Sequence, residues 1–193
     1  AEIYHAQTIC VPGAGGDYAA ICPLMPVGAG TSTPHLTWND APLPISGFVM
    51  LEIAGARRRY HAPLTRTIHL GKPPQAIKDV AKAVVEGVDA GLAKARSGNS
   101  AADVEAAWQA GLRKHGLKKE SRVGYSSGLA YPRDWGERTV SLRPGDETVL
   151  QAGMCFHIQS GVWLQDFGVA ISESFVVSDK GGERLCDVAR ELI

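Results

Sequence analysis

The chain has 193 residues, and its 20 lysines and arginines balance its 20 aspartates and glutamates, so the formal net charge is zero. A neutral chain without blocks of like charge has no electrostatic field that would attract nucleic acid or an anionic membrane. We therefore expect one domain with a substantial core, and we exclude nucleic acid and membranes as partners.

The first third of the chain predicts a helical turn, a loop region and a hairpin. Residues 1–7 favour a helix but carry no initiator methionine, helix start signal or secretory signal, so we expect that an upstream segment is missing from this sequence. Residues 11–34 are rich in glycine, proline, serine and threonine, which predicts loops around a short strand at residues 19–27. The apolar run GFVMLEIAG predicts a buried strand.

The next run alternates between two faces and should pair with that buried strand. In residues 57–70, Tyr60, Leu64 and Arg66 share one face, while His61 and Pro63 share the other. A hairpin is the natural pairing, with its turn expected near residues 54–57.

The middle of the chain predicts two helices, and its last third predicts strands. Residues 73–99 begin with prolines, repeat apolar residues at spacings of three and four, and end on basic residues. Ser100 and Asp103 predict a capped second helix that ends before Gly116. Strands and loops return from Arg122 onward, so the order of elements predicts an α+β fold with a mainly antiparallel sheet backed by helices.

The cysteines indicate a reducing compartment. They lie far apart without a CxxC pair, and no apolar run approaches the roughly 20 residues of a membrane span. We expect a cytoplasmic protein whose cysteines are reduced, mostly buried thiols; they are Cys10, Cys22, Cys155 and Cys186.

Two glutamates lie in strands that are otherwise apolar. Glu52 follows Leu51 and precedes Ile53, and Glu173 lies in a similar strand. A carboxylate is costly to bury unless it is paired, so Glu52 is either ion-paired with an arginine or kept for function. The sequence leaves both interpretations open.

A histidine and a set of aromatic residues lie in glycine-rich loops. His35 follows such a loop and could face a cleft, although a lone histidine is more often a surface residue. The segment 124–137 places aromatic residues among glycines and charges, a composition that can hold a small cation or simply pin a surface loop. The aromatic residues concerned are Tyr125, Tyr131 and Trp135, with Trp163 as a further candidate for the same wall.

Common catalytic motifs are absent from the sequence. The six histidines form no HxxH or HExxH pattern, and no Cys/His cluster occurs. The glycine-rich stretches lack the lysine of a phosphate-binding loop. GYSSG resembles a serine hydrolase elbow only superficially, because no helical pattern follows it.

Several segments, taken together, resemble a known superfamily. TSTPH, LEIAGARRRYHAPLTRT, GYSSG, LQAGMCFHIQSGVW and GVAISESFVVSDKGGERL resemble, in order and spacing, the catalytic domain of the creatinase, prolidase and aminopeptidase P superfamily. The resemblance implies that residues 1–193 form a partial pita-bread domain, whose front and whose separate amino-terminal domain lie outside this sequence. It also implies a homodimer.

Metallopeptidases of this superfamily bind two metal ions through five side chains, and the resemblance shows what stands at those positions here. Only one of the five residues could be a charged ligand, and proline offers no side-chain donor at all, so we expect neither a metal ion nor another cofactor. The five residues are Glu52, Pro63, Tyr125, Gln159 and Ser172.

A closer resemblance is to the metal-independent ectoine hydrolase branch. It rests on PHLTW, RRYH, GYSSGLAYPRDWGE, SLRPGD and the ES pair. It implies a small-molecule substrate, ectoine or a similar cyclic amidine, whose ring is opened to an N-acetyl-2,4-diaminobutyrate. The alternatives are a pita-bread relic that binds a ligand or protein without catalysis, an X-Pro peptidase, and a creatinase-like amidinohydrolase.

The resemblance suggests a role for each candidate residue. Glu52 would be a carboxylate nucleophile, His35 would move a proton to the leaving nitrogen, and Glu173 or Tyr125 would orient substrate or water. Aromatic faces would hold the substrate cation, and an arginine or a hydroxyl group would hold its carboxylate. The substrate-binding candidates are Tyr60, Arg66, Tyr131, Trp135, Glu137, Trp163 and Thr33.

Overall fold

The computed structural model describes residues 1–8, 15–39 and 41–193 of the chain. Cys10 and the start of the predicted 11–34 loop region therefore lie outside the described residues. Among the described residues, no helix has both the length and the apolar character that crossing a membrane would require.

The order of elements matches the predicted α+β class. A helix and a short 3₁₀ helix precede a long hairpin, two helices follow, and seven strands complete the chain. The first part comprises α1 (Glu2–Thr8), η1 (Gly28–Ser32), β1 (Gly47–Arg57), β2 (Tyr60–Leu70), α2 (Gln75–Lys94) and α3 (Ala101–Arg113). The second part comprises β3 (Gly124–Ser127), β4 (Gly136–Leu142), β5 (Cys155–Ile158), β6 (Gly161–Trp163), β7 (Gly168–Ala170), β8 (Glu173–Val177) and β9 (Gly182–Arg184).

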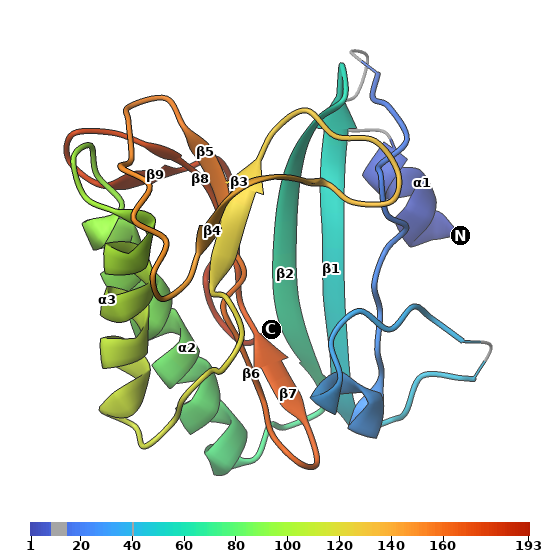
Figure 1. Ribbon diagram of the computed structural model, residues 1–193. Coiled ribbons are helices and arrows are strands. Elements are labelled where there is room, and N and C mark those ends of the chain that lie inside the picture. Colours follow the sequence, from blue (N-terminus) through green and yellow to red (C-terminus); the bar gives the residue numbers. More distant parts are fainter. Residues whose placement is uncertain (9–14, 40) are drawn as a thin grey trace.

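The strands form a central antiparallel sheet between the helices and the hairpin. This sheet has the strand order β4-β3-β5-β8-β9, while β1 pairs with β2 and β6 with β7, all antiparallel. In Figure 1, helices α2 and α3 lie on one side of the sheet and the hairpin lies on the other. The main apolar core is formed between the helices and the sheet, with Trp108 of α3 fully buried in it.

Both long helices begin as the sequence predicts. The Ser100 hydroxyl accepts a hydrogen bond from the Asp103 amide, and the Asp103 carboxylate accepts one from the Ser100 amide, which forms a complete capping box. The predicted second helix is thereby confirmed.

The hairpin is confirmed, but its predicted turn is wrong. The strands pair from Gly47 with Leu70 to Arg57 with Tyr60, so the turn consists of Arg58 and Arg59 rather than residues 54–57. Both arginines have positive φ angles, 49° and 67°, as a two-residue hairpin turn requires. Neither is a usual residue for such a turn, so the sequence carries no signal for it.

Contacts with other loops stabilise this unusual turn. The Arg59 amide donates to the Asp17 carboxylate at 2.9 Å, and its guanidinium group donates to the Ala130 carbonyl. The same guanidinium carbon lies 4.4 Å from the ring centroid of Tyr18 and 4.9 Å from that of Tyr131.

Two further expectations need correction. The predicted strand at residues 19–27 is reduced to two isolated bridges to β1, formed by Leu24 and Val27, because the glycine-rich and proline-rich sequence around them cannot sustain a ladder. The three cysteines that the structure describes are free thiols, as predicted, but they are only partly buried.

Pro63 fits into β2 because its nitrogen faces away from β1. Its partner in the hairpin is Ala54, whose amide donates to the Gln7 side chain at 3.1 Å instead of to β2. The pair is therefore a non-hydrogen-bonded one, where a missing amide hydrogen costs no ladder bond. The Pro63 carbonyl accepts a hydrogen bond of 2.7 Å from the Ser174 hydroxyl.

The hairpin is joined to the sheet through side chains. The Thr65 amide donates to the Ser172 hydroxyl at 2.7 Å, and the Ser172 amide donates to the Thr65 carbonyl at 3.1 Å. The Thr67 hydroxyl donates to the Ala170 carbonyl and accepts from the Ala170 amide. We call these contacts between β2 and residues 170–174 the hairpin–sheet seam.

Helices α2 and α3 pack so closely that they meet at glycines. A Cβ atom at Gly111 would lie 3.0 Å from the Cα atom of Gly87, and this neighbour is backbone that cannot rotate away. We expect Gly111→Ala to lower the free energy of unfolding by about 1–2 kcal/mol, because overpacking outweighs the roughly 1 kcal/mol that alanine adds to helix propensity. Urea unfolding measures this change. Gly30→Ala is the control, since its nearest neighbour would be a side-chain atom 3.6 Å away; equal effects of the two substitutions would contradict the packing argument.

Candidate active site

Glu52 is buried in β1 and faces a polar side chain rather than an arginine. It is 4% exposed, and its two carboxylate oxygens lie 3.4 and 3.5 Å from the Gln159 side-chain nitrogen. Among the described residues it forms no salt bridge. Of the two interpretations left open by the sequence, an arginine ion pair is therefore excluded within the described part of the chain.

Burial changes the acidity of this carboxyl group. Desolvation raises the pKa of Glu52 to about 7, although the hydrogen bond from Gln159 and the charge of Lys119 act in the opposite direction. Near neutral pH, the group is therefore divided between its acid and its carboxylate form.

Gln159 links Glu52 to His35. The Gln159 amide nitrogen lies 3.4 Å from the Nε2 atom of His35 as well as within reach of the Glu52 carboxylate, and an amide has two hydrogens to share. His35 belongs to the exposed loop after η1 and has a φ angle of 66°. Desolvation of the ring lowers the pKa of His35, and the charge of Arg122 lowers it further, so the imidazole is neutral at pH 7.

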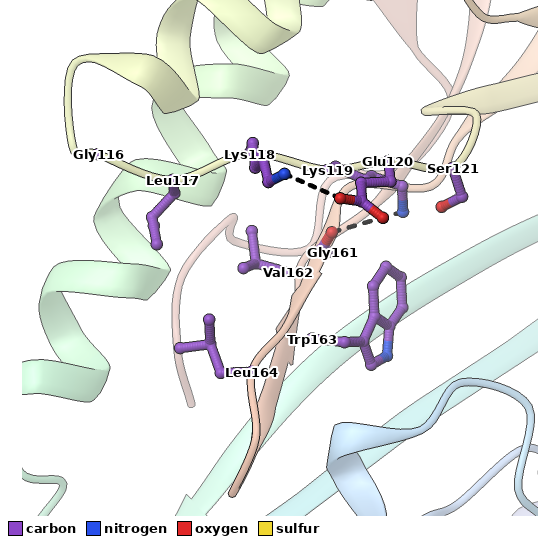
Figure 2. A pocket seen from close by; sticks show the side chains of 10 residues that line it. All are labelled: Gly116, Leu117, Lys118, Lys119, Glu120, Ser121, Gly161, Val162, Trp163 and Leu164. Carbon is purple, nitrogen blue, oxygen red and sulfur yellow. Dashed lines mark hydrogen bonds and ion pairs between the residues drawn. The ribbon is translucent and has the colours of Figure 1, made fainter.

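Lys119 is a buried cation that the sequence analysis missed. Its ammonium group donates to the carbonyls of Gln159 and Gly161 at 3.2 and 3.4 Å and lies 4.0 Å from the centroid of the Trp163 ring. Figure 2 shows this neighbourhood, with the Trp163 indole beside the carbonyl of Gly161. Burial lowers the pKa of Lys119 to about 7, against the opposing charge of Glu52. A single lysine in a basic loop carries no sequence signal that distinguishes it from surface lysines.

A hydrogen-bonded chain of buried side chains lies next to Glu52. The two ring nitrogens of His157 lie 2.8 Å from the Tyr125 hydroxyl and 2.7 Å from the Ser172 hydroxyl. The Trp135 indole donates to the same Tyr125 hydroxyl at 2.7 Å. Burial lowers the pKa of His157 to about 3, so its imidazole is neutral and donates one of these bonds while accepting the other.

His157 was also missed by the sequence analysis, although a signal for it exists. It lies in β5 two residues before Gln159, which directly follows the end of that strand, so the sequence places the two polar side chains close together. The buried imidazole of His157 is hydrogen-bonded both to Tyr125 of β3 and to Ser172 of the hairpin–sheet seam.

These residues border a cavity of about 410 Å³, which we call the Gln159 pocket. Gln159 and His35 line it, and the Glu52 carboxylate contacts the Gln159 side chain. Tyr125 and Trp135 supply aromatic surface. The polar side chains that complete the lining are Thr37, Arg122, Arg133 and Asp134.

The structure brings four of the predicted site residues together. Glu52, His35, Tyr125 and Trp135 all lie at or directly behind the Gln159 pocket. Thr33 is exposed in the loop that leads to His35.

Glu173 and Arg66 are not brought to this pocket. Because Ser172 points toward His157, its neighbour Glu173 projects from the opposite face of the chain. There Glu173 forms a buried salt bridge of 2.7 Å with Arg66, whose guanidinium group also donates to backbone carbonyls. The predicted roles of Arg66 in substrate binding and of Glu173 in catalysis therefore find no support in the geometry.

The remaining candidates lie elsewhere. Tyr60 and Glu137 line a second cavity of about 400 Å³. Trp163 lines the cavity of about 550 Å³ drawn in Figure 2. Tyr131 is exposed beside the Arg59 guanidinium group.

Known proteins place the chain in a family. It belongs to metallopeptidase family M24, whose model matches residues 1–179. The chain is 46% identical over 179 residues to the ectoine hydrolase of Halomonas elongata, and the aligned region covers 92% of this chain and 45% of that protein. It is 42% identical over 193 residues to an uncharacterized hydrolase/peptidase of Sinorhizobium fredii, and the aligned region covers 100% of this chain and 49% of that protein.

Solved structures of this family confirm the pita-bread fold. Dipeptidase PepE from Mycobacterium ulcerans superposes with a TM-score of 0.82 at 26% identity, over 93% of this chain and 48% of that one. X-Pro aminopeptidase from Thermotoga maritima superposes with a TM-score of 0.85 at 20% identity, over 100% of this chain and 53% of that one. The chain thus spans about half the length of the relatives that it matches.

The M24 family name implies metal ions, but the residues at the expected positions do not fit a metal pair. The hydroxyl groups of Tyr125 and Ser172 are both bonded to His157, and Pro63 has no side-chain donor. Gln159 presents its amide nitrogen to Glu52, which is the wrong end of the group for a cation. Within residues 1–8, 15–39 and 41–193, no group of three histidine, cysteine or acidic side chains could hold a metal ion.

The raised pKa of Glu52 predicts how stability depends on pH. The folded state holds the Glu52 proton more tightly than the unfolded state, because the pKa moves from 4.5 to about 7. The stabilising contribution of protonation is complete below pH 4.5 and is lost as the pH rises through 7. Relative to wild type, Glu52→Gln should therefore gain about 3 kcal/mol in free energy of unfolding between pH 4.5 and 7, and then level off.

Denaturant unfolding of both proteins at a series of pH values measures this difference. Glu147→Gln, which alters an exposed carboxylate, is the control and should run parallel to wild type. A Glu52→Gln curve that also runs parallel to wild type would show that the Glu52 carboxyl is not desolvated.

Proposed function

We propose that this chain carries the catalytic domain of a metal-independent hydrolase that opens the ring of a small cyclic amidine, with ectoine as the leading candidate. The observation that carries the proposal is the buried Glu52 carboxyl, bonded to Gln159 behind a pocket that also holds His35. The 46% identity to a protein named ectoine hydrolase supports the choice of substrate. The proposed product is an N-acetyl-2,4-diaminobutyrate.

The wider setting is part of the same proposal. Residues 1–193 would form part of the pita-bread catalytic domain of a cytoplasmic homodimer, together with a separate amino-terminal domain. The half-length coverage of the relatives supports a longer whole protein.

The Gln159 pocket suits a small zwitterion. Ectoine carries a delocalised amidinium group in its ring and a carboxylate beside it. The amidinium would lie toward Glu52, where an ionised carboxylate offsets its charge, and against the aromatic wall of Tyr125 and Trp135. A bound cation also lowers the pKa of Glu52, so that the substrate itself favours the reactive carboxylate.

The first chemical step joins Glu52 to the substrate. A carboxylate oxygen attacks the amidinium carbon, a C–O bond forms, and the electron pair of the C=N bond moves to nitrogen. His35, which is bonded to Gln159, would take the proton from the nitrogen that stays on this carbon and pass it to the ring nitrogen that leaves, whose bond to the carbon then breaks.

Water completes the reaction. It attacks the carbon held by Glu52 while the neutral His35 accepts its proton and passes it to the nitrogen of the forming amide, and Glu52 leaves as a carboxylate. The net change adds one water to the amidine and leaves one amide and one amine. An X-Pro peptidase is less well supported, because it requires metal ions for which the residues of this pocket are unsuited.

Removing the nucleophile tests the proposal directly. Glu52→Gln should lower kcat for ectoine ring opening by at least about a thousandfold, since a covalent catalyst is lost, and His35→Ala should also lower it strongly. Product formation is followed in excess chelator, with the exposed Glu147→Gln as the matched control. Loss of wild-type activity in chelator would overturn metal independence, and near-normal turnover by Glu52→Gln would overturn the nucleophile.

Lys119 should set the pH range of activity. Because Glu52 must be ionised, kcat/KM should rise as the pH increases through about 7. The charge of Lys119 lowers the pKa of Glu52, so Lys119→Met should move this rise to higher pH. Lys118→Met, which removes the neighbouring exposed charge, should leave the profile in place. An unchanged profile for Lys119→Met would show that the two buried groups are not coupled.

A further inference from the structure

Two arginines face the Gln159 pocket without an acidic partner. Arg122 and Arg133 both line the pocket, and neither takes part in a hydrogen bond or salt bridge among the described residues. The guanidinium carbon of Arg122 lies 4.6 Å from the centroid of the Tyr125 ring. This stacking orients Arg122 and leaves its N–H donors available.

The one carboxylate that lines the same pocket is already bonded. Asp134 accepts a hydrogen bond of 3.0 Å from Arg138 and another from the Gly136 amide. Neither of these two contacts involves Arg122 or Arg133. Two guanidinium groups in one concave surface, neither of them in a salt bridge with a carboxylate of the described residues, favour an anionic ligand.

The arginine that the sequence suggested as the partner of a substrate carboxylate is already bonded to other groups. Arg66 was the predicted partner of a substrate carboxylate, but its guanidinium group is buried and is bonded to Glu173 and to the carbonyls of Thr65, Ser172, Val188 and Ala189. A zwitterionic substrate in the Gln159 pocket must therefore find its cation elsewhere.

We propose that Arg122 and Arg133 form a carboxylate subsite at the mouth of the Gln159 pocket. The inference rests on the proposed function and narrows its substrate class: the ligand is a cyclic amidine that also bears a carboxylate, rather than any small amidine. The amidinium end lies toward Glu52 and the carboxylate end toward the two guanidinium groups, which can each present paired N–H donors to it.

This arrangement also has a consequence for specificity. An uncharged or purely cationic amidine would leave both guanidinium groups without a partner, and a simple carboxylate would leave Glu52 without one. Only a ligand that carries both groups gives a partner to Glu52 and to the two arginines at once.

A comparison of two ligands tests the subsite. The probes are ectoine and the same methyl-tetrahydropyrimidine ring without its carboxylate, and their Kd values are measured by calorimetry at fixed salt. Arg122→Gln and Arg133→Gln should each weaken ectoine binding by about ten- to a hundredfold, the range for hydrogen bonds to a charged group. Neither should change the Kd of the decarboxylated ring by more than about twofold, within the error of such comparisons.

The controls separate the subsite from general damage. Arg113→Gln removes an exposed arginine at the end of α3 and should change neither Kd. The thermal unfolding midpoint of each variant establishes that it is folded, and Arg133→Gln keeps the test decisive if Arg122→Gln does not fold.

Each outcome has a distinct meaning. A loss restricted to ectoine supports the subsite. Equal losses for both ligands, or no loss for either, would overturn it, because the arginines would then shape the pocket without contacting the carboxylate. A wild-type protein that binds neither ligand would instead reject the proposed function itself, a result that no behaviour of the arginine variants can imitate.

Discussion

The hairpin–sheet seam is the constraint on which the site depends. The hairpin reaches residues 170–174 through side chains as well as backbone, and at its centre the Ser172 hydroxyl accepts the Thr65 amide. The same hydroxyl is bonded to His157, which in turn holds Tyr125. A small change in the position of β2 would therefore move both Glu52, through its partner Thr65, and the far wall of the pocket. Stability of the fold and geometry of the site share one set of contacts.

Burying Glu52 lowers the stability of the fold, and the same burial gives the carboxyl group a pKa suited to acid–base chemistry. An isolated carboxylate in this position would favour protonation, and its raised pKa expresses that cost. Lys119 is buried nearby at a similar cost, with its pKa lowered to about 7. Burial thus raises the pKa of the acid and lowers the pKa of the base, so that the two move toward each other. Such a balance is typical of acid–base sites, whereas a structural ion pair is held firmly in its charged form.

Much of the fold could be predicted from the sequence, because local patterns determine it. The apolar spacing of α2, the capping box of α3 and the alternation in β2 each depend on residues close together in the chain. The hairpin turn could not be predicted, because Arg58 and Arg59 adopt positive φ angles only with support from the loops of Tyr18 and Ala130. That support comes from distant parts of the chain.

The site was predictable only in part, for the same reason. Glu52 and His35 stand out in the sequence because each is chemically out of place among its neighbours. Lys119 does not stand out, since it becomes unusual only when the fold buries it against Gln159 and Trp163. Arg66 stands out but misleads, because nothing near it in the sequence shows that Glu173 will be its partner.

For the proposed metal-independent reaction, the decisive neighbour of Glu52 is Gln159. A carboxylate at this position would face Glu52 at hydrogen-bonding distance, and two negative charges so close would need a cation between them. The amide removes one of those charges and supplies a donor, so Glu52 can ionise alone. His157 of β5 bonds to Tyr125 and Ser172, which stand at the positions where two further metal ligands would be needed. The neutral residues at these metal-ligand positions therefore act together. With Gln159, Tyr125 and Ser172 present, Glu52 is the one carboxylate among them whose charge must be neutralised. A cationic substrate would supply the opposite charge.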